Sequence, residues 1–224
     1  IIGCGKIAQV RHLPEYDEHP EAQICGLFDI NLPRAQELAQ QYGAKAYDSY
    51  EALLADPEIE AISVCTPNKV HPLIAIDELR AGKNVLCEKP MALDLDECKE
   101  MIKVARECGK ELMVGQVGRY TPAFRKAKEL YESGAIGELF LIESEYAHDY
   151  SKIGGAGGWR VTPEREPIIG GGCHAVDLIR MIAGNPEEVF AYAKDNNLIL
   201  IEGIKTAYCP GFEQLMGVAC SGLI

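Results

Sequence analysis

The sequence lacks three features that would each point to a different class of protein. No apolar run approaches the roughly 20 residues of a membrane-spanning helix, so no helical span is expected. Positive charge is scarce: 22 Lys and Arg face 34 Asp and Glu, for a formal net charge of -12. This balance argues against nucleic acid as the main partner, because phosphate neutralisation needs clustered basic residues. It still permits one anionic cofactor, which backbone N–H groups can bind.

Cysteine patterns typical of metal sites are missing as well. The nine cysteines are scattered, and they form neither a Cys-x-x-Cys pair nor a Cys/His cluster at zinc spacing. We therefore predict small buried thiols, a reducing cytoplasmic location and no metal site. No signal peptide is visible, although a chain that starts at Ile1 leaves a lost leader open.

The first half of the chain alternates short apolar runs with amphipathic segments of helical length. Strands are predicted over 22–29, 59–66, 84–87 and 111–117. Helices are predicted between them over 33–42, 72–81 and 94–108, each closed by a glycine. Strands that alternate with helices in this way indicate right-handed crossovers and a parallel sheet. The predicted fold class is therefore α/β.

The pattern changes near Tyr120. A helix is predicted over 122–133, a long strand over 138–148, a helix after the triplet at 170–172, and a strand over 187–193. Long strands with helices grouped apart indicate an α+β domain. We therefore divide the chain into a dinucleotide-binding domain at 1–118 and a substrate and oligomerisation domain at 119–224. Residues 194–224 show no clear continuation of the sheet pattern, and we expect residues to be missing at the start and around or after Lys194.

The turn Gly3-Cys4-Gly5-Lys6-Ile7-Ala8 fits a dinucleotide-binding motif in its context, because apolar residues precede it and a helix start follows. Gly3 permits the tight turn, Gly5 lets the backbone approach a pyrophosphate, and Ala8 keeps the helix close to the sheet. The helix N-terminus supplies N–H groups and partial positive charge.

An acidic residue at the end of the second strand is expected to bind the adenosine ribose, and Asp29 is the candidate. Its charge favours NAD over NADP, because it would repel a 2′-phosphate. Arg34 lies close enough in sequence to soften that preference, so NADP stays possible. The alternative interpretation is a plain glycine-rich turn with a solvated Asp29.

Two further stretches follow predicted parallel strands: 64–71 (VCTPNKVH) and 87–92 (CEKPMA). Both therefore lie at the carboxyl edge of the sheet, where ligands bind in this class of fold. Later in the chain come Arg119-Tyr120-x-Pro122, Gly158-Trp159-Arg160 and the run 172–177 (GCHAVD).

In this order, from residue 1 to about residue 193, the motifs resemble those of the Gfo/Idh/MocA oxidoreductases, a family named for glucose-fructose oxidoreductase and inositol dehydrogenase. The resemblance implies a Rossmann domain followed by an α+β domain whose open, mainly antiparallel sheet often mediates homodimers or homotetramers. It implies hydride transfer between NAD(P) and a sugar, a polyol or a related carbonyl. It also implies a cis bond before Pro90.

The resemblance places Lys89 in the active site, His174 at the reacting hydroxyl, and Thr66, Pro67, Asn68 and His71 along the dinucleotide. Chemically, Lys89 could polarise the substrate oxygen and share its proton. A neutral imidazole is favoured for His174 at a helix start, and Asp177 lies one turn further on the same face. The predicted catalytic residues are Lys89, His174 and Asp177. The predicted cofactor-binding residues are Gly3, Gly5, Lys6, Ile7, Ala8, Asp29, Arg34, Thr66, Pro67, Asn68, His71, Glu88 and Lys89. The predicted substrate-binding residues are Arg119, Trp159, Arg160 and His174.

The sequence departs from the family pattern at two positions. Gly170 stands where many relatives carry Asp, so a substrate-binding carboxylate is either missing or replaced by Asp177 or a loop acid such as Glu164. Val117 stands where Asn is common. Structural roles remain open for several candidates: Lys89 as a surface lysine, His174 as a helix cap, Asp177 as a structural partner, Arg160 as a solvated charge, and His71 as a helix-start residue. His12, His19 and His148 are expected to be surface or structural residues.

These observations favour an NAD(P)-dependent dehydrogenase or reductase acting on a sugar or polyol. Two alternatives keep the cofactor: a glycosidase that uses bound NAD transiently, and a non-catalytic dinucleotide sensor. The presence of both Lys89 and His174 argues against the sensor, because a sensor need not retain a pair of proton-transfer groups.

Overall fold

The computed structural model describes residues 1–147, 168–188, 190–194 and 198–202. It divides into two compact units: one formed by Ile1–Ala92 with Asp96–Gly115, the other by Leu93–Leu95 with Gln116–Ile224. Among the helices that the structure describes, none is both long and apolar enough to cross a membrane.

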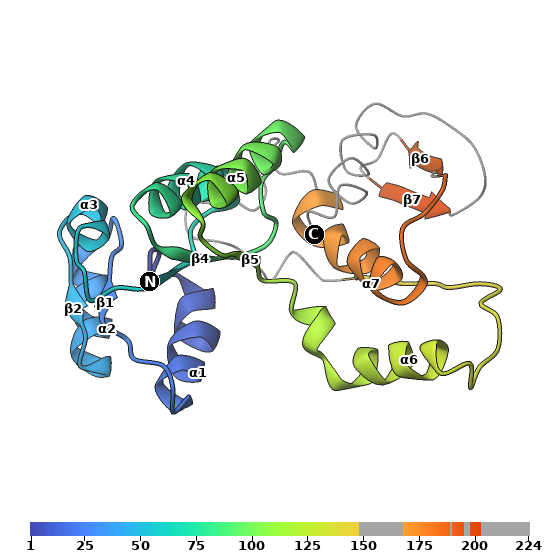
Figure 1. The fold of residues 1–224 in the computed structure, drawn as a ribbon, viewed down its shortest axis with the longest axis horizontal. Coiled ribbons are helices and arrows are strands. Elements are labelled where there is room, and N and C mark those ends of the chain that lie inside the picture. The colour runs from blue at the N-terminus through green and yellow to red at the C-terminus, as the bar shows by residue number, and fades with distance from the viewer. Residues whose placement is uncertain (148–167, 189, 195–197, 203–224) are drawn as a thin grey trace. The chain divides into compact units, whose positions relative to one another are not determined.

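A parallel sheet forms the centre of the N-terminal unit (Figure 1). Strands β3 (Ala61–Val64), β4 (Asn84–Cys87) and β5 (Leu112–Val114) pair in that order. Strand β1 (Gly26–Leu27) pairs in parallel with β2 (Lys45–Ala46). Ile2 connects the two groups, because it forms parallel bridges to both Phe28 and Val64. The predicted α/β class with a parallel sheet is confirmed.

The helices of this unit alternate with the strands, as the sequence predicts. After the first turn come a π-helical segment η1 (Ala8–His12) and α1 (Leu13–Glu18). The later helices are α2 (Leu32–Tyr42), α3 (Tyr50–Leu54), η2 (Asn68–Val70), α4 (His71–Arg80) and α5 (Leu95–Cys108). The glycines that follow α2, α4 and α5 all have positive φ, between 60° and 79°, which suits a residue without Cβ at a helix C-terminus.

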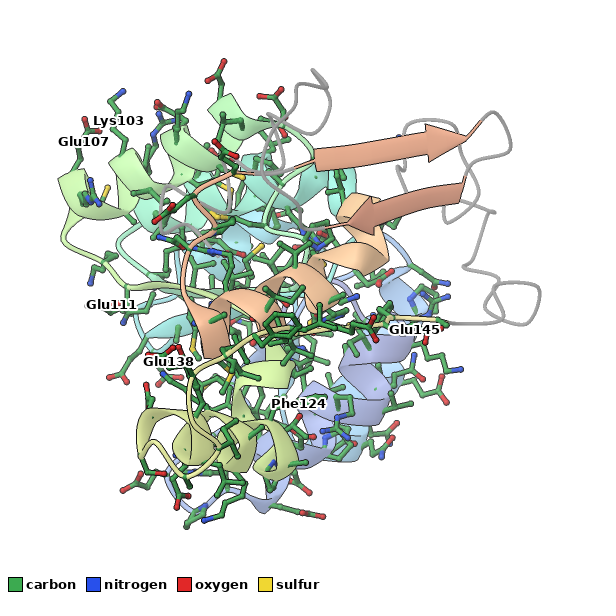
Figure 2. All side chains as sticks on the ribbon, turned by 90° about the vertical axis from the view of Figure 1, so that its right-hand side faces the viewer. Lys103, Glu107, Glu111, Phe124, Glu138 and Glu145 are labelled. Carbon is green, nitrogen blue, oxygen red and sulfur yellow. The ribbon has the colours of Figure 1, made fainter. Side chains whose placement is uncertain are left out.

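Two hydrophobic clusters stabilise the sheet. One packs Cys4 and Leu13 against Leu27 and the buried face of α2, and the other surrounds Ile2 and Ile62. Helix α5 is amphipathic: Met101 and Val104 are buried, whereas Lys103 and Glu107 point outward in Figure 2. The predicted buried thiols are confirmed at these free cysteines: Cys4, Cys65, Cys87, Cys98 and Cys173.

Three of the four predicted strands of this unit are longer than the observed ones, and only that over 84–87 has its predicted bounds. The run at 22–29 forms β1 over two residues only, and the run at 111–117 ends as β5 at Val114. The reason at the second site is local: Gly115 follows, and Val117–Tyr120 turns into the 3-10 helix η3. Apolar alternation continues past the point where the backbone stops pairing.

The C-terminal unit contains α6 (Pro122–Glu132), the π-helical segment η6 (Ile168–Gly172) and α7 (Cys173–Ala183). Strands β6 (Phe190–Lys194) and β7 (Leu198–Glu202) pair antiparallel. Both predicted helices are confirmed.

Two predictions for this unit are wrong. The strand expected over 138–148 does not form over 138–147, where the structure describes the chain, and Phe140 is fully exposed there. An alternating pattern needs a neighbouring strand to pair with, and no described residue pairs with this segment. The sheet pattern was also expected to stop at Lys194, yet β7 begins at Leu198 and pairs with β6. Its run of apolar residues does not alternate, so it carried no strand periodicity in the sequence.

Candidate cofactor and active site

The predicted phosphate turn has the geometry that its glycines require. Gly3 has φ +92°, and a Cβ there would lie 2.7 Å from the carbonyl carbon of Cys65, so any side chain would collide with the end of β3. A Cβ at Gly5 would meet no atom within 4 Å, so open space faces the backbone at this point. Ala8 is completely buried against the core. The turn is therefore compact on its inner side and open where a ligand would approach.

A helix starts at Lys6, directly after the second glycine of the turn. The Gln9 N–H donates to Gly5 O at 3.1 Å, and the Gln9 side-chain amide donates to Cys4 O at 2.8 Å. These bonds fix the helix start against the turn. N–H groups in a first helical turn have no intrahelical acceptor, so they give this end partial positive charge. Lys6 is exposed and Ile7 half-buried at this end.

Asp29 is held directly against the turn. Its Oδ2 accepts the N–H of Cys4 at 2.7 Å, and its Oδ1 accepts the N–H of Asn31 at 2.7 Å. Arg34 Nη1 lies 3.8 Å from the same Oδ2. Asp29 and Arg34 therefore lie close together. This closeness is what the predictions require, because Asp29 is expected to favour NAD and Arg34 to soften that preference.

At the end of β3, the loop that carries Thr66, Pro67 and Asn68 is anchored by His71. His71 Nδ1 lies 2.8 Å from Pro90 O, and Nε2 lies 2.9 Å from Thr66 O. Burial lowers the pKa of His71, although its two backbone hydrogen bonds act in the opposite direction. Both ring nitrogens thus face protein carbonyls, which is the contact pattern of a residue that joins two loops.

At the end of β4, the residues on both sides of Lys89 are fixed. Glu88 Oε1 lies 2.8 Å from His12 Nε2, and Glu88 Oε2 accepts the N–H of Lys89 at 3.2 Å. Burial alone would raise the pKa of Glu88, but the hydrogen bond and charge of His12, with the Lys89 N–H, bring it below its usual range. Lys89 is half-buried, and its bond to Pro90 is cis, as predicted.

Sequence reasoning assigned His12 no part in this site. His12 ends the π-helical segment that follows the turn, and its side chain is 10% exposed. A π-helical turn of this kind often occurs at functional sites. This signal is visible only in the structure, and the residue pattern does not show it.

In the C-terminal unit, two predicted site residues bind each other. Arg119 Nε donates to both carboxylate oxygens of Asp177, at 2.9 and 2.8 Å, and Nη2 donates to Oδ1 at 2.5 Å. Asp177 is 2% exposed, so this is a buried bidentate pair. These contacts give Asp177 the structural role that the sequence left open. Its catalytic role stays a prediction.

His174 lies in the first turn of α7, where it was expected, and its ring is 4.7 Å from that of Tyr146, measured between centroids. The sequence analysis did not single out Tyr146. Trp159, Arg160 and Glu164 lie outside the described residues. Gly170, which replaces the carboxylate common in relatives, is a buried residue of η6.

The residues that the N-terminal unit brings together fit a dinucleotide. The helix start, the open space at Gly5 and the carboxylate of Asp29 lie around one turn. Thr66 Oγ1 is buried and has no hydrogen-bond partner among the described residues, so it could bond to a ligand at the same sheet edge.

The chain is similar in sequence to two dehydrogenases. D-glucoside 3-dehydrogenase of Escherichia coli (strain K12) is 30% identical over 192 residues, covering 83% of this chain and 54% of that protein. Trans-1,2-dihydrobenzene-1,2-diol dehydrogenase of Mus musculus is 34% identical over 202 residues, covering 87% of this chain and 59% of that protein. The chain thus spans a little over half the length of these relatives.

A solved structure and two family models complete the comparison. The WlbA dehydrogenase of Bordetella pertussis, in complex with NADH and UDP-GlcNAcA, is 27% identical with a TM-score of 0.77, over 87% of this chain and 61% of that one. Residues 124–200 match the GFO/IDH/MocA C-terminal domain. Residues 1–116, over half the chain, match the model described as an oxidoreductase family with an NAD-binding Rossmann fold. The chain therefore belongs to the Gfo/Idh/MocA oxidoreductases, and its N-terminal unit is their NAD(P)-binding Rossmann domain.

Proposed function

We propose that the protein is an NAD(P)-dependent dehydrogenase or reductase that acts on a CH–OH group of a sugar, a polyol or a related carbonyl compound. The observation that carries this proposal is the position of Lys89. It follows β4 at the same edge of the sheet that carries the phosphate turn and the loop of Thr66. In a parallel sheet this edge is where ligands bind, so a basic side chain there lies where substrate chemistry takes place.

Different residues of the N-terminal unit would bind different parts of the cofactor. The turn from Gly3 to Ala8 would hold the pyrophosphate by its backbone, and Asp29 would accept hydrogen bonds from the adenosine ribose. Because a carboxylate repels a 2′-phosphate, NAD is the proposed cofactor. Arg34, 3.8 Å from Asp29, makes NADP acceptable. When bound, the nicotinamide ring accepts or donates the hydride.

Side chains of the protein would carry out the proton transfer. Oxidation of an alcohol removes a hydroxyl proton together with a hydride, so a basic group must contact the substrate oxygen. Lys89 would polarise this oxygen and share its proton, and His174 would contact the same hydroxyl. Asp177 is proposed to support α7 through Arg119, and Arg119, Trp159 and Arg160 remain proposed substrate contacts.

Names of relatives support the substrate class. One acts on a D-glucoside and another on a dihydrodiol, and the WlbA structure contains a nucleotide sugar. All are compounds with hydroxyl groups on a ring. We further propose a homodimer or homotetramer, by analogy with the family, and a cytoplasmic location, because the described cysteines are free thiols.

The test is a panel of polyols, glycosides and ketosugars, assayed with NAD and NADP by the absorbance of the reduced nicotinamide. Lys89→Met removes the ammonium but keeps an unbranched side chain, and we expect it to lower turnover at least about a hundredfold. NADH binding, measured by fluorescence, should persist in this variant. Sugar release without net NADH would instead indicate a glycosidase, and tight NADH binding with no turnover of any panel member would indicate a sensor.

A further inference from the structure

Two histidines contact the residues on either side of Lys89. His12 binds the side chain of Glu88, the preceding residue, and His71 binds the carbonyl of Pro90, the following one. All of these residues belong to the N-terminal unit. The proposed reaction gives neither histidine a part in proton transfer, so their contacts call for another explanation.

On one side, the Glu88 carboxylate is held at both of its oxygens. His12 Nε2 lies 2.8 Å from Oε1, and the Lys89 N–H donates to Oε2 at 3.2 Å. The Glu88 N–H also donates to Val64 O at 3.0 Å, which ties the backbone to β3. Because the side chains of Glu88 and His12 are only 13% and 10% exposed, little water competes for these bonds.

His12 is itself fixed in place. Its ring makes an edge contact with Tyr16, with centroids 6.0 Å apart. The Tyr16 hydroxyl lies 2.6 Å from Ser63 Oγ on β3, so the helix that carries His12 is joined to the sheet. The imidazole that contacts Glu88 is thus linked to β3 through Tyr16.

On the other side, the His71 ring spans two loops. Nδ1 lies 2.8 Å from Pro90 O and Nε2 lies 2.9 Å from Thr66 O, and the side chain is 1% exposed. A neutral imidazole carries one N–H and donates to one of these carbonyls, whereas an imidazolium donates to both. In either state the ring lies between the backbone just after Lys89 and the loop that follows β3. A lateral shift of Pro90 would disturb this contact.

We propose that His12 and His71 are positioning residues for Lys89, which they act on by fixing the Glu88 side chain and the Pro90 carbonyl. The inference deepens the proposed function and rests on it, since there Lys89 acts on the substrate oxygen. A lysine side chain has several rotatable bonds. The position of its ammonium group is therefore defined only if the backbone that carries the side chain is held in place. A displacement of about 1 Å at a reacting group can cost about a hundredfold in rate.

The decisive comparison is His12→Leu against His12→Gln. Glutamine keeps an N–H donor for Glu88, whereas leucine fills the space without one. We expect His12→Leu to lower kcat at least about tenfold while the KM for the cofactor changes less than about twofold. His12→Gln should recover most of the loss. His19→Gln is the matched control, because His19 is an exposed histidine just after α1, and it should leave kcat unchanged.

A second readout needs no substrate. A short pulse of acetic anhydride, followed by mass spectrometry, gives the labelling of Lys89 relative to Lys103, which points outward from α5 in Figure 2. We expect this ratio to change at least about threefold in His12→Leu and to return toward the wild-type value in His12→Gln. If no substrate is found for the wild-type protein, the proposed function fails, while the labelling ratio still tests the positioning.

Two results would overturn the proposal. One is a folded His12→Leu protein with wild-type kcat and labelling ratio, and the other is an equal loss in both His12 variants. If His12→Leu does not fold, Glu88→Gln replaces it, since it keeps the shape and weakens the bond to His12. An unchanged labelling ratio in that variant would overturn the proposal as well.

Discussion

Two predicted site residues are carboxylates with little exposure, one in each compact unit, and their partners bind them differently. The guanidinium of Arg119 donates to both carboxylate oxygens of Asp177. The imidazole of His12 contacts one oxygen of Glu88, and the Lys89 N–H donates to the other. A carboxylate that resembles a catalytic acid in the sequence can therefore serve to hold a neighbouring residue.

Breaking the pair of Arg119 and Asp177 should have the largest effect on stability. Arg119→Ala leaves the carboxylate of Asp177 buried without its cation, and we expect it to lower the free energy of unfolding by about 3 kcal/mol. The value falls at the lower end for a buried pair, because the Arg119 side chain is 37% exposed. Denaturant unfolding measures it. Arg80→Ala is the control: its partner Glu100 is 3.9 Å away on the surface, so a loss below about 1 kcal/mol is expected. Equal losses would remove the distinction between the pairs.

A third carboxylate, that of Glu78, extends the comparison. Glu78 is fully buried, and neither of its carboxylate oxygens has a hydrogen-bond partner among the described residues. Burial raises its pKa well above the ordinary 4.5. A raised acid pKa stabilises the fold below the ordinary value, and this stability is lost as the pH rises toward the folded-state pKa.

Glu78→Gln should therefore raise the free energy of unfolding at pH 8 by about 1–2 kcal/mol, since glutamine cannot ionise. At pH 4 the gain should disappear, because the carboxyl group is then protonated in both states. Thermal unfolding at the two pH values measures this difference. Glu37→Gln, on the exposed face of α2, is the control and should change neither value. A gain of the same size at both pH values would contradict the explanation.

For Glu88 we expect a pH dependence opposite to that of Glu78. Because His12 and the Lys89 N–H hold the pKa of Glu88 below its ordinary value, the pair stabilises the fold above pH 4.5. That stability is lost as the pH falls below 4.5 toward the folded-state pKa. Glu88→Gln should cost about 1 kcal/mol at pH 7, the net value of one hydrogen bond, and less at pH 3.5. A loss that does not depend on pH would show that the charge of Glu88 contributes nothing.

The smallest effect is expected at the pair of Arg34 and Asp29. Arg34 Nη1 lies 3.8 Å from Asp29 Oδ2, beyond hydrogen-bond distance, so Arg34→Ala should change stability by less than about 0.5 kcal/mol. It should, however, weaken NADP binding more than NAD binding, because it removes a positive charge near the expected 2′-phosphate. Fluorescence titration with NADH and NADPH measures the ratio of the two affinities. Arg11→Ala, in an exposed pair on η1, should leave that ratio unchanged.

Local rules made much of the fold predictable. The strand over 84–87 has the predicted bounds, and the helices that end before Gly43, Gly82 and Gly109 were found through those glycines. The turn at Gly3 was likewise visible as a motif, whereas the cis bond before Pro90 was expected from the family resemblance. The strand expected over 138–148 shows the limit of such reasoning, because alternation describes a face but cannot supply a pairing partner.

Contacts between distant residues were beyond the sequence. His12 and Glu88 are 76 positions apart, and their contact depends on how the helix after the turn packs on the sheet edge. Arg119 and Asp177 are 58 positions apart, and they were predicted separately, Arg119 as a substrate-binding residue and Asp177 as a catalytic one. Arg119 and Asp177 are both polar residues in motifs typical of a functional site. Only the structure shows that they bind each other. The catalytic roles of Lys89 and His174 remain predictions.

The double bridge of Ile2 has a consequence for local unfolding. Its N–H donates to Ser63 O and its carbonyl accepts the N–H of Cys65, while the Gly3 N–H donates to Phe28 O. These bonds join the two groups of strands directly beside the phosphate turn. Opening the sheet at this line would therefore also dismantle the cofactor turn. Amide hydrogens here, that of Cys65 above all, should exchange slowly with solvent and still more slowly once a dinucleotide is bound.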